Sequence, residues 1–187
     1  MPEKSLRLDP KRNLVLIGYR ATGKTAAGAR LAQVLGRRFV DLDQVLVQEA
    51  GQSIAEIVAQ RGWEEFRRRE KELVARFCHP EGLVLATGGG VVLDDENVQA
   101  LRQSGLIIWL TADAATIQAR LAQDKSPKDS RPSLTGADPL AEVTEVLQSR
   151  QRLYLAAAQI IVDTADRSVT QVVEEILATL QTGCDAP

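Results

Sequence analysis

The sequence predicts a three-layer α/β domain, in which a parallel five-stranded sheet is flanked by helices. Short apolar runs alternate along the chain with segments whose apolar residues recur at helical spacing. The apolar runs are continuous rather than interrupted by polar residues, which is typical of strands that helices cover on both faces. Strands separated by helices favour parallel pairing, because a parallel neighbour is reached only through a crossover connection.

Each strand is expected where a short apolar run ends in glycine or a polar residue. NLVLIG leads into a glycine-rich loop, and RRFVDLD ends in two acids. LVLA precedes TGGG, and QIIVDT ends in an acid and a threonine. With LIIWL as the fourth, the strands are expected over residues 13–18, 37–43, 83–86, 106–110 and 159–164.

The first helix is expected soon after the first strand. Ala27, Leu31, Val34 and Leu35 recur at helical spacing and would form its apolar face. Gly36 follows as a helix stop, because glycine readily takes the left-handed conformation at a helix C-terminus.

Further helices are expected between the later strands and at the end of the chain. SIAE at residues 53–56 is a capping box, so a helix should begin there and end near Gly62. A charged helix is expected over 62–78, another over 113–123 and a last one over 169–180.

Composition and charge exclude several classes of protein. The 187 residues, 44% hydrophobic and 26% charged, fit one globular domain with a substantial core. A net charge of −2 gives no general basic field, so we expect no nucleic-acid partner. No secretory signal and no apolar run of membrane-spanning length are present, so we expect no membrane partner. Cys78 and Cys184 match no metal or redox spacing, which favours reduced thiols in a cytoplasmic protein.

The chain is expected to form a single domain over residues 13–181. Residues 1–12 would be an N-terminal extension that need not be ordered, and 182–187 a C-terminal tail. Segment 123–139 is polar and interrupted by prolines, which is typical of a mobile surface segment.

The loop after the first strand, GYRATGKT at residues 18–25, fits the phosphate-loop pattern G-x-x-x-x-G-K-[ST]. In this pattern, backbone N–H groups of the loop and of the next helix surround phosphate oxygens. Lys24 would reach the β- and γ-phosphates of ATP, and the Thr25 hydroxyl would bind Mg²⁺. A chance glycine turn with a solvated lysine is the alternative, but the position between a buried strand and an amphipathic helix favours a nucleotide site. Its residues would be Gly18, Ala21, Thr22, Gly23, Lys24, Thr25 and Ala26.

Two acids, Asp41 and Asp43, end the second predicted strand. Residues i and i+2 of a strand share a face, so both carboxylates would point into the cleft beside the phosphate loop. Asp41 would hold Mg²⁺ through water, and Asp43 would meet a substrate hydroxyl. The alternative is helix capping, because Asp is a favoured N-cap residue and a helical segment follows.

The third strand delivers Gly88, Gly89 and Gly90 to the same cleft. Three glycines cost backbone entropy and add no packing, so bare backbone must be needed there. The alternative is a tight strand-to-helix turn, but such a turn needs one or two glycines rather than three.

Six motifs together carry a family resemblance. GYRATGKT, FVDLD, FRRRE at 66–70, TGGG, SRPSL at 130–134 and RQRLY at 150–154 occur in this order. They closely resemble the motifs of the shikimate kinase family, over about residues 13–180. The resemblance implies a P-loop kinase fold with a closing lid. It also implies transfer of the ATP γ-phosphoryl group to the 3-hydroxyl of shikimate, in the pathway to aromatic amino acids.

The resemblance implies roles for individual residues as well. Asp43 would hydrogen-bond the ring hydroxyls of shikimate and act as the base for the attacking one. Lys24 and Arg131 would act on the transferring phosphate, the arginine coming from a lid over 123–139. The helical segment 43–78 would bind the substrate. The acceptor would be bound by Asp43 at its hydroxyls and by Arg67 and Arg150 at its carboxylate. Its ring would lie against Gly88, Gly89 and Gly90.

Three adjacent arginines lie in the FRRRE motif, and the resemblance selects Arg67 as the ligand. Consecutive helical residues diverge by about 100°, so Arg67, Arg68 and Arg69 cannot all face one ligand. Glu70, three residues after Arg67, could hold it in place.

Two positions depart from the family pattern. Ala21 stands where the family usually has glycine, and a positive φ there would cost alanine about 1 kcal/mol. The family motif has a proline two residues after the arginine, and this chain has Arg152 there. The motif therefore does not fix the helix geometry around Arg150. For Lys125 and Lys128, which also lie in the predicted lid, the sequence predicts no specific ligand contact.

Other functions have weaker support from the motifs. A gluconate-type or other polyol kinase would also use Asp43, but FRRRE and TGGG argue against it. A GTP-dependent switch should carry N-K-x-D and an ABC-type ATPase L-S-G-G-Q, and neither occurs. A non-catalytic nucleotide-binding relative is disfavoured, because the residues expected to carry turnover are all present, namely Lys24, Thr25, Asp41, Asp43, Arg67 and Arg131. A small-substrate kinase needs no partner subunit, so we expect a monomer.

Overall fold

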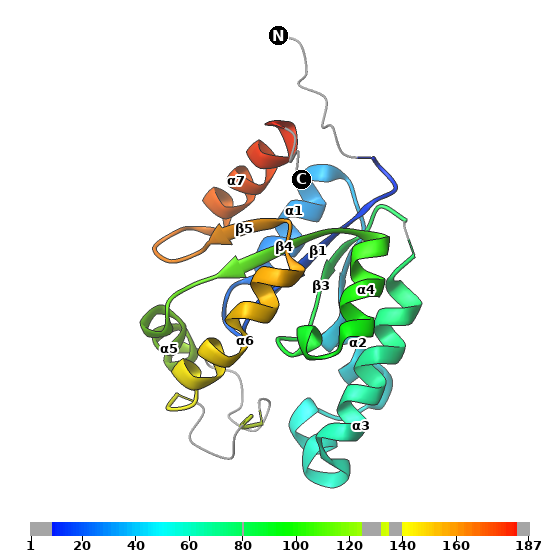
Figure 1. Cartoon of the computed structure of the whole chain (residues 1–187), viewed down its shortest axis with the longest axis vertical. Helices are drawn as coiled ribbons and strands as arrows, with labels where there is room; N and C mark the ends of the chain where they lie inside the picture. The colour runs from blue at the N-terminus through cyan, green and yellow to red at the C-terminus, as the bar shows by residue number, and fades with distance from the viewer. Residues whose placement is uncertain (1–8, 80, 125–131, 135–139, 183–187) are drawn as a thin grey trace.

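The protein folds as a parallel five-stranded sheet with helices on both faces (Figure 1). Its computed structural model describes residues 9–79, 81–124, 132–134 and 140–182. The strand order is β2-β3-β1-β4-β5, and every neighbouring pair is parallel, which confirms the predicted α/β fold class. The strands are β1 (Asn13–Ile17), β2 (Phe39–Asp41), β3 (Val84–Ala86), β4 (Gly105–Thr111) and β5 (Ile160–Asp163).

Helices connect successive strands and form the two outer layers (Figure 1). No helix in the described ranges is long and apolar enough to cross a membrane. The helices are α1 (Lys24–Leu35), α2 (Leu42–Ala50), α3 (Ile54–Phe77), the 3₁₀ helix η1 (Val91–Leu93), α4 (Asp95–Ser104), α5 (Ala114–Gln123), α6 (Val143–Ala157) and α7 (Val169–Thr182).

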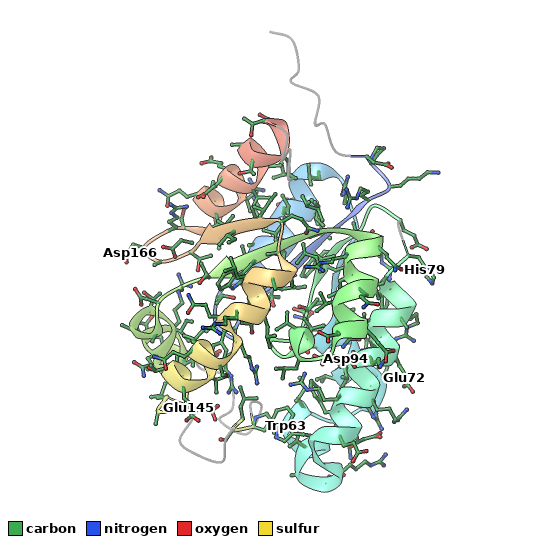
Figure 2. The ribbon with its side chains drawn as sticks, viewed as in Figure 1. Trp63, Glu72, His79, Asp94, Glu145 and Asp166 are labelled. Carbon is green, nitrogen blue, oxygen red and sulfur yellow. The ribbon has the colours of Figure 1, made fainter. Side chains whose placement is uncertain are left out.

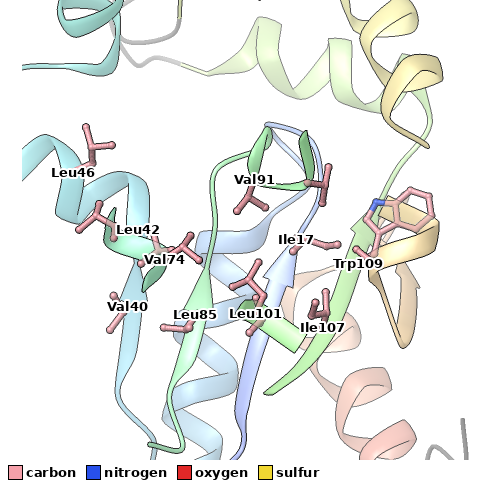
Figure 3. Packing of buried hydrophobic residues seen from close by; sticks show 14 of the residues in the cluster. Ile17, Val40, Leu42, Leu46, Val74, Leu85, Val91, Leu101, Ile107 and Trp109 are labelled. Carbon is pink, nitrogen blue, oxygen red and sulfur yellow. The ribbon is translucent and has the colours of Figure 1, made fainter. Parts of the chain in front are cut away.

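Strand β1 divides the core, since successive strand residues point to opposite faces. Leu14 and Leu16 are buried against α1 and α7 on one face. Val15 and Ile17 are buried on the other face, in a cluster with side chains of α2, α3, α4 and α6 (Figure 3). Burial on both faces explains why the sequence of β1 is a continuous apolar run.

Three local helix signals are confirmed. Ser53 Oγ accepts from the Glu56 N–H at 3.2 Å, and the Glu56 carboxylate accepts from the Ser53 N–H at 2.7 Å, which completes the capping box of α3. At Gly62 the backbone leaves the helical conformation, with φ 79° and ψ 171°, so the two predicted helices meet there at a kink. Gly36 ends α1 with a φ of 63°.

Two details of the predicted elements are wrong. Strand β2 ends at Asp41 rather than at residue 43, because Asp41 caps α2 and Leu42 is already helical. Val34 is 47% exposed, because the buried face of α1 is shifted away from Val34, toward Gly28 and Ala32. That buried face consists of Ala27, Gly28, Leu31 and Ala32.

Candidate active site

Most of the predicted site residues meet in one cavity at the carboxyl ends of β1, β2 and β3, where parallel sheets bind ligands. The cavity has a volume of about 460 Å³, which suits a small molecule. Gly18 and Thr22 belong to the same loop but do not line the cavity. The predicted residues that do line it are Ala21, Gly23, Lys24, Thr25, Ala26, Asp41, Asp43, Arg67, Gly88, Gly89, Gly90 and Arg150.

The phosphate loop is wound around the side chain of Lys24. Its Nζ donates to the carbonyl oxygens of Gly18 and Tyr19, both at 2.8 Å. The Thr22 hydroxyl also donates to the Tyr19 carbonyl at 2.8 Å, which tightens the turn. Gly23 is the N-cap of α1 and supplies no side-chain cap. The first N–H groups of α1 therefore remain available to phosphate oxygens at the cavity wall.

Ala21 has a φ of 60°, in the left-handed region that favours glycine. Ala21 therefore has the positive φ that was expected to be unfavourable at this position, and the conformation costs alanine about 1 kcal/mol relative to glycine. The Ala21 carbonyl accepts a hydrogen bond from Arg120 Nη1 at 3.2 Å, and the same nitrogen donates to Thr164 Oγ1 at 2.9 Å. These contacts tie the loop to α5 and to the end of β5.

Both carboxylate oxygens of Asp41 accept hydrogen bonds. Thr25 Oγ1 donates to Asp41 Oδ2 at 2.6 Å. Asp41 Oδ1 accepts from the backbone N–H groups of Asp43 and Gln44, at 3.1 and 3.2 Å. Capping thus falls to Asp41 rather than to Asp43. The prediction that the two acids share a strand face is wrong, because Asp43 lies in the first turn of α2.

Thr25 and Asp41 carry oxygen atoms of the kind that Mg²⁺ prefers as ligands. One hydroxyl and one carboxylate leave most of the coordination sphere to phosphates and water, as is usual for this ion in nucleotide sites. The described residues contain no group of three or more His, Cys, Asp or Glu side chains that could hold a metal by themselves. The donor set therefore fits an ion that arrives with a nucleotide.

The carboxylates of Asp43 and Glu70 approach each other over Gly88. A Cβ atom at Gly88 would lie 2.6 Å from Glu70 Oε1 and 2.9 Å from Asp43 Oδ1, so only glycine leaves room for both. Burial, followed by the charges of Glu70 and Asp41, raises the pKa of Asp43 from 3.8 to about 7. A carboxylate with a pKa near neutrality is suited to accept the proton of a reacting hydroxyl.

Arg67 lies on the cavity wall, and Glu70 holds it as predicted. Arg67 Nη1 donates to Glu70 Oε2 at 2.5 Å, and the guanidinium packs 5.1 Å from the ring centre of Phe66. Burial raises the pKa of the Glu70 carboxyl, while the charge of Arg67 opposes this shift. A Cβ atom at Gly90 would overlap the guanidinium of Arg67. Gly88 and Gly90 thus make room for the protein's own side chains.

The other two arginines of FRRRE face away from the cavity. Arg68 is exposed and pairs with Glu65 at 2.8 Å and with Glu72 at 2.5 Å. Arg69 pairs with Glu65 at 2.7 Å. The prediction that the three arginines point in different directions is confirmed.

Arg150 and Tyr154 both donate to the carbonyl oxygen of Gly89. Arg150 is buried, and its Nη1 lies 3.1 Å from that oxygen, while Tyr154 donates through its hydroxyl. The Tyr154 ring stacks on Trp109, with ring centres 5.6 Å apart. Helix α6 runs unbroken past Arg152, whose side chain is exposed. The missing proline therefore leaves Arg150 on the cavity wall.

Sequence reasoning missed Arg20 and Glu142. Arg20 of the phosphate loop pairs with Glu142 Oε1 at 3.0 Å, at the start of α6. No local pattern marks this pair, since the two residues are 122 positions apart. Arg131, both lysines and most other residues of the predicted lid (123–139) lie outside the described residues.

A phosphate loop between β1 and α1, with an acid and an arginine across a small cavity, defines a P-loop kinase of small molecules. A family model described as shikimate kinase matches residues 20–181. The chain belongs to the shikimate kinase family, which confirms the resemblance seen in the motifs.

Individual relatives agree with this assignment. A shikimate kinase of Symbiobacterium thermophilum is 44% identical over 169 residues, which cover 90% of this chain and 96% of the relative. One of Syntrophus aciditrophicus is 39% identical over 91% of each chain. The structure of Acinetobacter baumannii shikimate kinase in complex with shikimate superimposes with a TM-score of 0.82 at 31% identity, over 89% of this chain and 90% of that one. A Sinorhizobium meliloti gluconokinase, at TM-score 0.56 and 14% identity over 92% of this chain and 93% of that one, shares the fold alone.

Proposed function

We propose that this chain transfers the γ-phosphoryl group of ATP to the 3-hydroxyl of shikimate, giving ADP and shikimate 3-phosphate. The observation that carries the proposal is the arrangement of Asp43, Arg67 and Arg150 around the glycine loop, in one cavity with Lys24. Family membership supports it, since the relatives are named shikimate kinases and one similar structure holds shikimate.

The reaction needs an attacking hydroxyl, a place for its proton and charge stabilisation at the phosphate. The 3-hydroxyl oxygen bonds to the γ-phosphorus, the bond from that phosphorus to the β,γ-bridging oxygen breaks, and the hydroxyl proton passes to Asp43. Lys24 and the N-terminus of α1 stabilise the negative charge on the phosphate oxygens. Positioning and charge stabilisation supply most of the catalysis in phosphoryl transfer, so a carboxylate base is sufficient.

The acceptor is held at its carboxylate and at its ring. The guanidinium groups of Arg67 and Arg150 suit a carboxylate, because each can donate two parallel hydrogen bonds. The ring lies along the backbone of residues 88–90, within reach of Asp43.

Thr25 and Asp41 would hold Mg²⁺ at the phosphates, Asp41 through water, and the bound ion would offset phosphate charge. Arg131 stays a predicted phosphate ligand from a lid over 123–139. Hydrogen exchange in this segment should slow when ATP and shikimate bind, and equal exchange with and without ligands would count against a lid. A cytoplasmic location stays a prediction, as does a monomer, which light scattering at assay concentration tests.

The test of function is an assay coupled to ADP release, with shikimate, gluconate and nucleoside monophosphates compared under the same conditions. We expect kcat/KM for shikimate to exceed that for the other acceptors by at least about 100-fold. Preferred turnover of gluconate would favour a polyol kinase. Nucleotide binding without turnover of any acceptor would favour a non-catalytic relative.

A further inference from the structure

Glu142 is a buried carboxylate that the proposed reaction does not use. Its side chain is 0% exposed. Its Oε1 accepts from Arg20 Nη2 at 3.0 Å, and its Oε2 accepts from Ser133 Oγ at 2.9 Å and from the Leu134 N–H at 2.8 Å. A buried ion pair contributes little stability compared with apolar packing of the same volume. The main effect of this ion pair is therefore to fix the positions of the residues that Glu142 contacts.

The partners of Glu142 come from separate parts of the cavity wall. Arg20 belongs to the phosphate loop, and Leu134 lines the cavity together with Pro132. Arg20 Nη2 also approaches the Pro132 carbonyl oxygen at 3.4 Å. One carboxylate thus joins the phosphate loop to residues 132–134, in the C-terminal half of the predicted lid.

Helix α6 extends this relation to the acceptor side. Glu142 directly precedes α6, and Arg150 lies about two turns, or about 12 Å, further along the helix. There Arg150 and Tyr154 hold the Gly89 carbonyl. Gly89 in turn lies against the phosphate loop, since a Cβ atom at this position would be 3.4 Å from the Arg20 nitrogen. The contacts form a closed ring of loop, Glu142, α6 and glycine backbone.

We propose that Glu142 is a positioning residue that couples nucleotide binding to acceptor binding, an inference that rests on the proposed function. Phosphate groups in the loop attract Arg20 and fix its contact with Glu142, which fixes the start of α6. Shikimate fixes the same ring from the other side, through Arg150. Whichever ligand binds second finds the ring already ordered, so each ligand strengthens the binding of the other.

Coupling is measured as the ratio of the shikimate Kd without nucleotide to the Kd with saturating ADP, by titration calorimetry. In the parent protein we expect a ratio of about 5 to 150, the usual range for coupled sites. Glu142→Gln keeps the shape of the side chain and removes its charge. We expect it to lower the ratio at least about threefold, with a change below about twofold in the shikimate Kd without nucleotide.

Three further variants separate coupling from simple loss of structure. Glu145→Gln is the matched control, because Glu145 is an exposed residue near the start of α6 (Figure 2) and should keep the parent ratio. Glu142→Asp keeps the charge and should restore part of the ratio. Ser133→Ala removes one donor to Glu142 without leaving a buried charge unpaired, so it decides the matter if Glu142→Gln does not fold. The melting temperature of each ligand-free variant reports the structural effect alone.

The outcomes distinguish this inference from the proposed function. The inference is overturned if the parent protein binds both ligands without coupling. It is also overturned if the folded Glu142 and Ser133 variants keep the parent ratio, or if Glu145→Gln lowers it equally. In these cases the proposed function stands. A parent protein that binds nucleotide but not shikimate overturns both.

Discussion

The Thr25 hydroxyl donates a hydrogen bond of 2.6 Å to Oδ2 of Asp41, so the first turn of α1 is joined to the end of β2. The other oxygen of the same carboxylate caps α2. Asp41 therefore has a structural task and is also available to a metal ion at the phosphate loop. A substitution that keeps capping and removes the charge separates the two.

Asp41→Asn is such a substitution, because Asn is as good an N-cap residue as Asp. We expect the Mg²⁺ concentration for half-maximal activity to rise at least about tenfold, the usual effect of losing an outer ligand. The fold should persist. The measurement is initial rate against free Mg²⁺ at fixed ATP, together with a thermal melt.

Asp94→Asn is the matched control. Asp94 caps α4 by accepting from the N–H groups of Glu96 and Asn97, and it does not line the cavity. Its Mg²⁺ dependence should equal that of the parent protein. If the Asp41 and Asp94 variants behave alike, Asp41 is only a helix cap.

Ala21→Gly should stabilise the protein, although glycine usually destabilises. The φ of 60° at Ala21 is unfavourable for alanine by about 1 kcal/mol, and glycine removes that cost. Loss of the partly buried methyl group offsets some of the gain. Ala29→Gly, on the exposed face of α1, should destabilise by about 1 kcal/mol, so the two substitutions should change the free energy of unfolding in opposite directions.

The pKa of Asp43, raised to about 7, predicts the pH dependence of catalysis. A general base must be ionised, so kcat/KM for shikimate should fall with decreasing pH below about 7. The slope should approach tenfold per pH unit. A profile that stays flat down to pH 5 would exclude Asp43 as the base.

The same pKa has a consequence for stability. Between about pH 4 and 7 the folded protein retains a proton on Asp43 that the unfolded chain has lost. The free energy of unfolding therefore falls as pH rises through this window, by at most about 1.4 kcal/mol per pH unit from this group. Asp43→Asn should be more stable than the parent at pH 8, and the difference should vanish toward pH 4. Denaturant titrations across this range measure it.

Lys24→Met should lower turnover by about 100-fold or more, the scale for removing a preorganised charge from a transition state. The measurement is kcat, with the nucleotide Kd determined separately because Lys24 also shapes the loop. Lys71→Met removes a surface lysine that pairs with Asp94 and Glu96 and should leave kcat near the parent value. Near-normal turnover of the Lys24 variant would remove the phosphate loop from the mechanism.

Local signals in the sequence predict much of the fold. The break at Gly62 and the cap at Ser53 depend on neighbouring residues only. DLD at residues 41–43 favours a strand because of its alternating acids, but capping by Asp41 starts α2 at Leu42 instead. Helix α4 is not predicted because its sequence is mostly polar, and of its buried residues Asn97, Leu101 and Ser104 only Leu101 is apolar.

Local sequence signals do not predict contacts between segments that are far apart in the chain. The family motifs place Asp43, Arg67 and Arg150 in the site, but the pairing of Arg20 with Glu142 depends on how α6 packs beside the phosphate loop. The triple glycine shows the same limit. Its pattern demands bare backbone, while the side chains that need the space, those of Glu70 and Arg67 among them, appear only in three dimensions.

The arginine pair of α3 tests the acceptor directly. Arg67 lines the cavity with its guanidinium held by Glu70, whereas Arg68 is exposed and paired with other acids. Arg67→Lys keeps the charge and loses the planar pair of donors, so shikimate should bind about 10- to 150-fold more weakly. Nucleotide binding should barely change, because the proposed phosphate ligands are Lys24 and the N-terminus of α1 rather than Arg67.

Arg68→Lys is the control on the same helix and should leave the shikimate KM within about twofold of the parent value. The shikimate KM and the nucleotide Kd are measured for both variants side by side. A selective loss at Arg67 establishes that the acceptor carries an anionic group next to this side chain. If both variants behave alike, Arg67 is a structural partner of Glu70, and an acceptor without a carboxylate at this position becomes the better assignment.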